Sequence, residues 1–207
     1  MSSIICAIGA YLIGSVSFAV LASRVFHLPD PRTYGSGNPG AANVLRSGKV
    51  PAALFTLLGD AAKGVAAVLL ARLLAPTFDF GPVTVALCAL AVVLGHLYPV
   101  FFGFKGGKGV ATSFGALLAL SPWAALVAAA VFVLVVALFR YVSLASILAA
   151  GAAALVSPLV LGWGAESAAV LAIAALVIWR HRANIQRLQH GTESKLNLRR
   201  RDAPRIG

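Results

Sequence analysis

Long apolar runs occupy most of this chain, and they restrict its fold more than any other feature of the sequence. The 207 residues are 60% hydrophobic and only 11% charged. About 20 helical residues cross a bilayer core about 30 Å thick, where unpaired backbone groups exclude open, irregular structures. The runs lack the alternation of barrel strands, so the sequence predicts an all-α, polytopic membrane bundle. Seven segments fit, at residues 4–26, 51–74, 82–102, 110–120, 122–139, 142–161 and 167–179.

These segments leave no room for a separate soluble domain. We expect one transmembrane domain over residues 1–195, followed by a basic, disordered tail at 196–207. The fourth segment is short and is cut off from the fifth by Pro122, which cannot continue a helix. It either extends back toward Gly107 or is partly re-entrant.

The distribution of Lys and Arg predicts how the bundle is oriented. With seven spans, residues 24–49, 103–109, 140–141 and the stretch from Arg180 share one side, which holds all 17 Lys and Arg except Lys63 and Arg72. Positive residues stay in the cytoplasm, so we expect the N-terminus outside and the C-terminus inside. The net charge of +11 suits anionic lipid headgroups. Nucleic-acid binding is not expected, since no aromatic platform accompanies these charges.

Three polar segments interrupt the apolar runs on that predicted cytoplasmic side. They read GSGNPGAANVLRSGK at 35–49, HLYPVFFGFKGGKGVATS at 96–113 and RHRANIQRLQHGTESK at 180–195. Glycine, amide and cationic side chains can hold phosphate groups beside the membrane. We therefore expect the three segments to form a single anion site.

The first segment combines flexible backbone with phosphate-binding side chains. Its glycines, which include Gly35 and Gly37, let backbone N–H groups converge as an anion nest. Ser36 adds a hydroxyl, and Arg46 adds a bidentate guanidinium. The amides of Asn38 and Asn43 complete the set of candidate ligands. A solvated turn before the next helix is the structural alternative.

The second segment places two lysines among glycines just before a helix. Gly106 and Gly107 separate Lys105 from Lys108, and Gly109 follows. The segment does not fit a P-loop, which requires GxxxxGK followed by Ser or Thr. Backbone donors and an ammonium at a helix start can still bind an anion, although lysines can also simply anchor a span at the interface.

The third segment continues the last apolar run. On one continuous helix, His181, Asn184 and Arg187 would share a face, because each follows the previous one by three positions. Glu193 follows shortly after. The alternative is a juxtamembrane helix with ordinary surface charges.

Other polar residues lie within or beside the spans. Asp60 and Lys63 sit three positions apart inside the second segment, where buried ionisable groups are usually paired or functional. Ser143 and Ser146 begin the sixth segment and can bond phosphate oxygens or their own helix. Cys6 and Cys88 are expected to be inert buried thiols, and no Cys/His cluster has zinc spacing.

Taken in order and spacing, the three polar segments resemble the bacterial acyl-phosphate:glycerol-3-phosphate acyltransferases, the PlsY family. RYVSLAS at 140–146 and GDAAKG at 59–64 are also similar, so the likeness covers about residues 11–193. The resemblance implies a multi-pass enzyme of the bacterial cytoplasmic membrane with its active site facing the cytoplasm. It implies acyl transfer from acyl phosphate to the 1-hydroxyl of glycerol 3-phosphate, giving lysophosphatidic acid and phosphate, without metal, CoA or other cofactor.

The resemblance also implies roles for particular residues. Ser36, Arg46, Lys108, Ser146 and Asn184 would hold phosphates or the acyl carbonyl. His181 would orient the glycerol hydroxyl or help to deprotonate it; alternatively, the substrate phosphate is the base and the enzyme supplies proximity. Glu193 would organise the third segment. Further candidates for substrate binding are Gly35, Gly37, Asn38, Asn43, Lys105, Gly106, Gly107, Gly109, Ser143 and Arg187. We expect a monomer.

Two other classes of membrane protein also bind phosphate or other anions. A metal-dependent lipid phosphotransferase needs several carboxylates, and the acids here are scattered. An anion transporter would use broken helices near the midplane and inverted repeats, whereas here the polar segments cluster on one side and no internal repeat is seen. A purely structural role would leave the three polar segments unexplained.

Overall fold

The computed structural model describes residues 1–196, which form helices and connecting loops with no strand among them. The α-helices, with two short 3-10 helices labelled η, are α1 (Ser2–Ser15), α2 (Phe18–Val25), α3 (Ala41–Val44), η1 (Leu45–Ser47), α4 (Val50–Phe78), α5 (Pro82–Leu97), η2 (Val100–Phe102), α6 (Val110–Leu120), α7 (Pro122–Phe139), α8 (Val142–Leu161), α9 (Ala165–Arg180) and α10 (Arg182–Gln189). The all-helical prediction is confirmed. All but the first residue of the expected basic tail lies outside the described residues.

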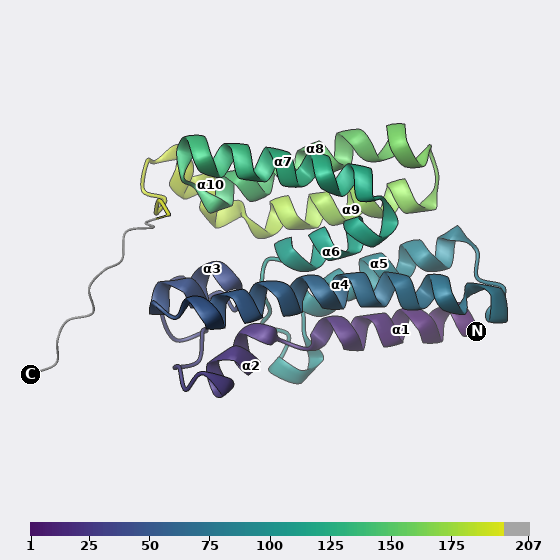
Figure 1. Ribbon diagram of the computed structural model, residues 1–207, viewed down its shortest axis with the longest axis horizontal. Helices are drawn as coiled ribbons and strands as arrows, with labels where there is room; N and C mark the ends of the chain where they lie inside the picture. Colours follow the sequence, from purple (N-terminus) through teal and green to yellow (C-terminus); the bar gives the residue numbers. More distant parts are fainter. Residues whose placement is uncertain (197–207) are drawn as a thin grey trace, which may run out of the picture.

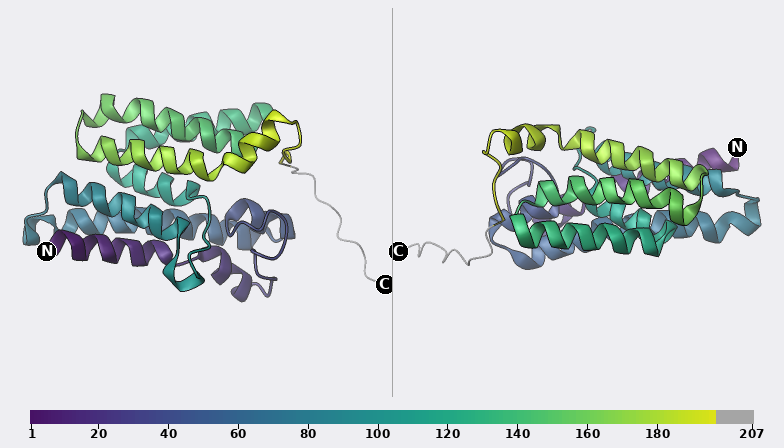
Figure 2. Two further views of the ribbon diagram at one scale, coloured as in Figure 1. Left: turned by 180° about the vertical axis from the view of Figure 1, so that it is seen from behind. Right: turned by 90° about the horizontal axis from the view of Figure 1, so that it is seen from above.

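The long helices run nearly side by side along one axis. In Figure 1, α7, α8 and α9 form an upper layer, α1, α4 and α5 form a lower layer, and α6 lies between them. Each of the layers is held by direct packing, of α7 and α9 against α8 and of α1 and α4 against α5. Both views in Figure 2 place α10 and the 27–49 segment toward the end of the bundle away from the N-terminus.

Glycines let two pairs of helices approach closely. A Cβ atom at Gly14 or Gly95 would meet the partner's backbone where α1 packs on α5, and the same holds for Gly64 and Gly115 where α4 packs on α6. Small residues allow membrane helices to pack backbone against backbone. The α4 contact thereby holds the short α6 inside the bundle.

Five helical segments are long and apolar enough to cross a membrane: α1 with α2, α4, α5 with η2, α7 and α8. A sixth is formed by α9 with α10, which meet at a bend of 55°. Helix α6 has 11 residues, or about 16 Å of helix, which is shorter than the bilayer core of about 30 Å. All seven predicted apolar segments are helical, and the described chain is a multi-pass helical bundle.

The first apolar segment is not one helix, contrary to the prediction. Helix α1 ends at Ser15, α2 begins at Phe18, and the intervening Val16 leaves the helical ladder. Its carbonyl accepts a hydrogen bond of 2.7 Å from the Lys63 ammonium on α4. A tertiary contact therefore satisfies the backbone group that the break exposes.

The fourth segment does not extend back toward Gly107, as one of the two predictions had it. Helix α6 begins only at Val110, because Gly109 before it has the left-handed φ of 84°. The stretch from Gly103 to Gly109 therefore remains a loop that leads into α6.

Asp60 and Lys63 form a buried ion pair within α4, which is the structural role that their spacing suggested. Lys63 Nζ lies 2.9 Å from Asp60 Oδ1, and each side chain is 3% exposed. His96 Nδ1 of α5 lies 3.5 Å from the same carboxylate oxygen and 3.2 Å from the Thr112 hydroxyl of α6. The pair thus sits in a polar cluster that connects α4, α5 and α6.

The two cysteines lie close to each other, between α1 and α5. Both are free thiols, with their Sγ atoms 3.4 Å apart. Cys88 is buried as expected, whereas Cys6 is partly exposed.

Candidate active site

The Glu193 carboxylate accepts hydrogen bonds from side chains of α8 and α10, and Asn184 connects it to Lys108. Glu193 Oε1 accepts hydrogen bonds from the Ser143 hydroxyl at 2.7 Å and from the Asn184 amide at 2.6 Å. Its Oε2 accepts a bond of 2.7 Å from Arg187 Nε. On the other side of the amide, Asn184 Oδ1 accepts a bond of 2.6 Å from the Lys108 ammonium. The second and third polar segments therefore meet, as predicted.

The glycine loop before Lys108 is held by backbone contacts. Arg180, the last residue of α9, donates to the Gly106 and Gly107 carbonyls at 3.0–3.2 Å. The Gly107 N–H donates to the carbonyl of His96 at 3.1 Å. A Cβ atom at Gly107 would collide with the imidazole of His96 and lie 3.1 Å from the Pro39 carbonyl. Glycine is therefore required at this close approach, which also brings the first polar segment beside the second.

Burial and neighbouring charges set the protonation of Lys108. Burial lowers the pKa of Lys108 to about 8; the charge of Glu193 opposes this, while those of Arg187, Arg46 and Arg180 add to it. The ammonium is still mostly protonated at pH 7. Cations from the first and third segments thus act on Lys108, and only Glu193 offsets them.

His181 lies at the bend between α9 and α10. It is 2% exposed, and its Nδ1 donates to the Val177 carbonyl at 2.7 Å. In the neutral imidazole, Nε2 is therefore left as a hydrogen-bond acceptor.

The bend corrects the prediction that His181, Asn184 and Arg187 lie on one continuous helix. Helix α9 ends at Arg180 and α10 begins at Arg182, so His181 is not part of the helix that carries the other two. Asn184 and Arg187 do share a face of α10, because both donate to Glu193. Hydrogen bonds from Ser143, Asn184 and Arg187 outweigh the effect of burial and lower the pKa of Glu193.

Asn43 organises the first polar segment from within. Its amide donates to the carbonyls of Pro31 at 2.7 Å and Tyr34 at 3.1 Å, and its oxygen accepts from the Ser36 N–H at 2.8 Å. With 2% of its surface exposed, its side chain is used to fold the loop. That Asn43 also binds a substrate stays a prediction.

The remaining candidates of the first segment lie at its surface. Gly35, Ser36, Gly37 and Arg46 are exposed, and Asn38 is half-buried. Gly35 and Gly37 have positive φ values of 59° and 66°, which favour glycine because a Cβ atom would be strained there. This part of the loop leaves the Ser36 hydroxyl and the Arg46 guanidinium facing outward.

Two other predicted residues are not brought into the Lys108 cluster. The hydroxyl of Ser146 donates to the Val142 carbonyl of its own helix at 2.8 Å, which is the structural alternative, and its role as a ligand stays a prediction. Lys105 lines a separate cavity together with Arg24 and Arg32. It therefore does not share the surroundings of Lys108.

Sequence reasoning missed two residues that hold the Lys108 loop, Arg180 and His96. Each is the first residue of a polar segment, so each was visible as a polar group at the end of an apolar run. Within residues 1–196, no three His, Cys, Asp or Glu side chains come together in a way that could hold a metal ion.

Known proteins match this chain over nearly its whole length. The family model described as glycerol-3-phosphate acyltransferase matches residues 4–191. A glycerol-3-phosphate acyltransferase of Nitrosospira multiformis is 54% identical over 96% of this chain and 98% of its own length. The corresponding protein of Thiobacillus denitrificans is 50% identical over 96% of this chain and 100% of its own.

Solved structures agree with the sequence matches. The fold is similar to that of PlsY, an integral membrane glycerol 3-phosphate acyltransferase, in its glycerol 3-phosphate form, with a TM-score of 0.86 and 39% identity over 95% of this chain and 96% of the other. The lysophosphatidic acid form of the same protein gives a TM-score of 0.85, at 38% identity and the same coverage. This chain belongs to the glycerol-3-phosphate acyltransferase family and is an integral membrane enzyme of phospholipid synthesis.

Proposed function

We propose that this enzyme transfers a fatty acyl group from acyl phosphate to the 1-hydroxyl of glycerol 3-phosphate. The products are 1-acyl-glycerol 3-phosphate and inorganic phosphate, in the first acylation of bacterial phospholipid synthesis. The observation that carries the proposal is the half-buried Lys108 ammonium, which donates a hydrogen bond of 2.6 Å to Asn184 and lies near Arg46, Arg180 and Arg187. Such a site suits a reaction in which two phosphate-bearing substrates must approach each other.

The site offers cationic and hydroxyl ligands to the substrate phosphates. Lys108, with the Ser36 hydroxyl and the Arg46 guanidinium of the first loop, binds phosphate oxygens. Cations held in place where negative charge builds up during acyl transfer stabilise the transition state, because they need no reorganisation at the moment of reaction. Glu193 positions Asn184 and Arg187 through its hydrogen bonds.

The transfer itself needs no group beyond the two substrates. The 1-hydroxyl oxygen of glycerol 3-phosphate forms a bond to the acyl carbon, and the bond from that carbon to the phosphate oxygen breaks. The hydroxyl proton moves to the departing phosphate, which leaves as hydrogen phosphate. The donor is already activated, so the enzyme contributes mainly orientation and charge stabilisation.

His181 orients the attacking hydroxyl. Its Nδ1–H group donates to the Val177 carbonyl, so Nε2 can accept a hydrogen bond from the substrate hydroxyl. In this mechanism the departing phosphate is the final proton acceptor, and His181 is a positioning group.

The membrane arrangement completes the proposal. Counting the short α6 as a seventh membrane segment, together with the six that are long enough to cross, would put the N-terminus outside and the Lys108 cluster at the cytoplasmic face of the bacterial inner membrane. A monomer is sufficient, since every residue named for the reaction belongs to one chain. Solved PlsY structures have glycerol 3-phosphate and lysophosphatidic acid forms, the acceptor and product proposed here.

A donor comparison tests the proposed reaction. The purified enzyme in detergent receives glycerol 3-phosphate with acyl phosphate, acyl-CoA or acyl carrier protein, in the presence of EDTA. We expect lysophosphatidic acid and an equal amount of phosphate only from acyl phosphate. Arg46→Ala and Lys108→Ala should remain folded but lose activity. Equal use of acyl-CoA contradicts the proposed donor, and full activity of both variants contradicts the proposed site.

A further inference from the structure

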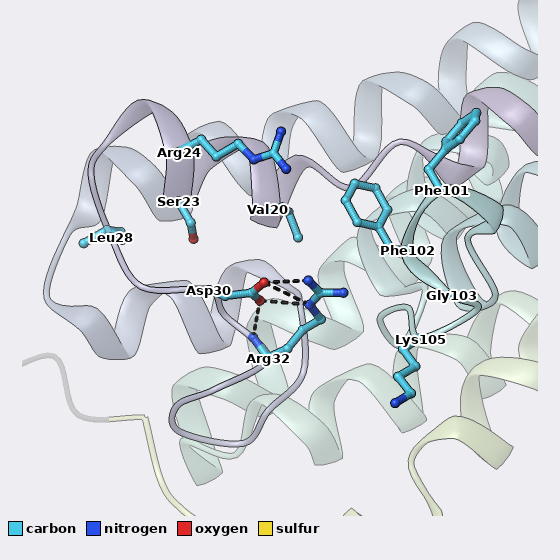
Figure 3. A pocket seen from close by; sticks show the side chains of 10 residues that line it. All are labelled: Val20, Ser23, Arg24, Leu28, Asp30, Arg32, Phe101, Phe102, Gly103 and Lys105. Carbon is cyan, nitrogen blue, oxygen red and sulfur yellow. Dashed lines mark hydrogen bonds and ion pairs between the residues drawn. The ribbon is translucent and has the colours of Figure 1, made fainter.

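A cavity lies apart from the Lys108 cluster. It has a volume of about 720 Å³ and is bounded by α2, the 28–32 segment and the loop after η2 (Figure 3). Its lining includes none of Ser36, Arg46, Lys108, His181 and Asn184. The proposed acyl transfer therefore leaves this cavity unexplained.

The polar part of the cavity carries a surplus of positive charge. Arg24 comes from α2, and Arg32 and Lys105 come from the two loops opposite it (Figure 3). The one acidic side chain of the lining, Asp30, pairs with Arg32 at 2.6 Å. The bond from Arg32, aided by the charge of Arg24, lowers the pKa of Asp30, so Asp30 stays ionised and neutralises one of the three cations.

The other two cations are available to a ligand. Among residues 1–196, neither Arg24 nor Lys105 has a hydrogen bond or an ion pair between side chains. A guanidinium forms bidentate bonds with phosphate oxygens, and an ammonium contributes a point charge. The lining thus offers two positive groups, on either side of the Asp30–Arg32 pair in Figure 3, to an anionic ligand.

Apart from Ser23 and Gly103, the rest of the lining is apolar, and it lies beside exposed hydrophobic surface. Val20, Leu28, Phe101 and Phe102 line the cavity, and Phe101 is 59% exposed. Phe104, on the same loop, is 58% exposed. A phosphate-binding wall beside exposed aromatic side chains at the cationic end of a membrane bundle matches the headgroup region of a bilayer.

The volume also favours a ligand larger than a free anion. Ligand pockets commonly measure about 300–1,000 Å³, and the cavity of about 720 Å³ falls within that range. A bound phosphate ion would leave most of this space and all of the apolar wall without a partner. A glycerophosphate headgroup with the first part of its acyl chains uses both.

We propose that this cavity binds the headgroup of an anionic phospholipid from the surrounding bilayer, whose negative charge Arg24 and Lys105 attract. The site is separate from the proposed reaction and requires no turnover. It would fasten α2 and the loop after η2 to the membrane surface. Because the Lys105 loop leads directly to Lys108, the lipid would lie next to the segment that carries the candidate active site.

Native mass spectrometry of the purified full chain tests the proposal in neutral detergent, without acyl donor or glycerol 3-phosphate. Phosphatidylglycerol and phosphatidylcholine are titrated separately, and inorganic phosphate is added as a competitor. We expect phosphatidylglycerol to bind more tightly than phosphatidylcholine and to resist displacement by phosphate. Arg24→Gln and Lys105→Gln should each weaken the binding about fivefold, as expected for one cation at a membrane surface.

Arg182→Gln is the matched control, because Arg182 is an exposed cation at the same end that lies over the Trp179 ring at 4.6 Å. It should bind phosphatidylglycerol as the wild type does. If Arg24→Gln does not fold, Lys105→Gln alone decides. Three results would overturn the proposal: unchanged phosphatidylglycerol binding in the variant that decides, equal binding of the two lipids, or full displacement by inorganic phosphate.

Discussion

Lys108 and Asn184 are 76 positions apart in the sequence, yet the lysine ammonium donates a hydrogen bond of 2.6 Å to the amide oxygen. This contact joins the loop that leads into α6 to the helix that follows α9. The same amide donates to Glu193 at 2.6 Å, so Asn184 connects the cation to the carboxylate. The position and the charge of Lys108 therefore both depend on the third polar segment.

The pH dependence of the reaction should report on Lys108. Its charged form binds phosphate, and its pKa is about 8, so kcat/KM should fall as the pH rises through about 8. A guanidinium remains protonated throughout this range, so Lys108→Arg should shift the basic limb to higher pH even if its rate at pH 7 is lower. The measurement is kcat/KM against pH for both enzymes, and an unchanged limb in Lys108→Arg would show that another group titrates.

Replacing the carboxylate of Glu193 should move the same limb in the other direction. Glu193 raises the pKa of Lys108, so Glu193→Gln should shift the basic limb of kcat/KM to lower pH while keeping the shape of the side chain. Glu166→Gln is the control, since Glu166 pairs with Arg72 instead of Lys108. Identical pH profiles for wild type and Glu193→Gln would refute the coupling.

Gly107→Ala should displace the loop that carries Lys108. The added methyl group would collide with the His96 ring and lie 3.1 Å from the Pro39 carbonyl. Since a shift of about 1 Å at a reacting group can cost about 100-fold in rate, we expect kcat/KM to fall by that order. Gly151→Ala in α8 is the control, because nothing lies within 4 Å of its new methyl group. Equal rates for the two variants would contradict the role of the close approach.

Lys63→Met should lower the stability of the fold. It removes the partner of Asp60 and the donor to the Val16 carbonyl. Leaving one member of a buried ion pair unpaired costs about 3–5 kcal/mol. Thermal unfolding in detergent should therefore show a much lower midpoint for Lys63→Met than for the double variant Asp60→Leu/Lys63→Met. Similar midpoints for wild type and Lys63→Met would mean that the pair contributes little.

The sequence predicted the fold through the hydrophobic runs. Run length, composition and the Pro122 break located helices in all seven segments, because these signals are local. The break at Val16 was not predictable in this way, since the group that satisfies its carbonyl is Lys63 on another helix. The bend at His181 was not predictable either, because no proline or glycine marks the point where the polar segment follows the apolar run.

The sequence predicted which residues belong to the site better than it predicted the hydrogen bonds between them. Lys108, Asn184 and Glu193 were chosen by residue type, but their mutual hydrogen bonds depend on how distant segments fold together. Asn43 has the composition of an anion ligand and bonds the backbone of its own loop. Amides serve both purposes equally well, so only the tertiary structure distinguishes them.

Equilibrium binding of glycerol 3-phosphate tests the central claim most directly, because it measures whether the first and second segments hold one phosphate together. Isothermal titration of the purified enzyme, without donor, is performed on wild type, Arg46→Gln, Lys108→Gln and the control Arg182→Gln. A lost charged hydrogen bond costs about 1.5–3 kcal/mol, or tenfold or more in Kd. We predict this loss for Arg46→Gln and for Lys108→Gln, with Arg182→Gln unchanged. Wild-type affinity in both Arg46→Gln and Lys108→Gln would contradict the account.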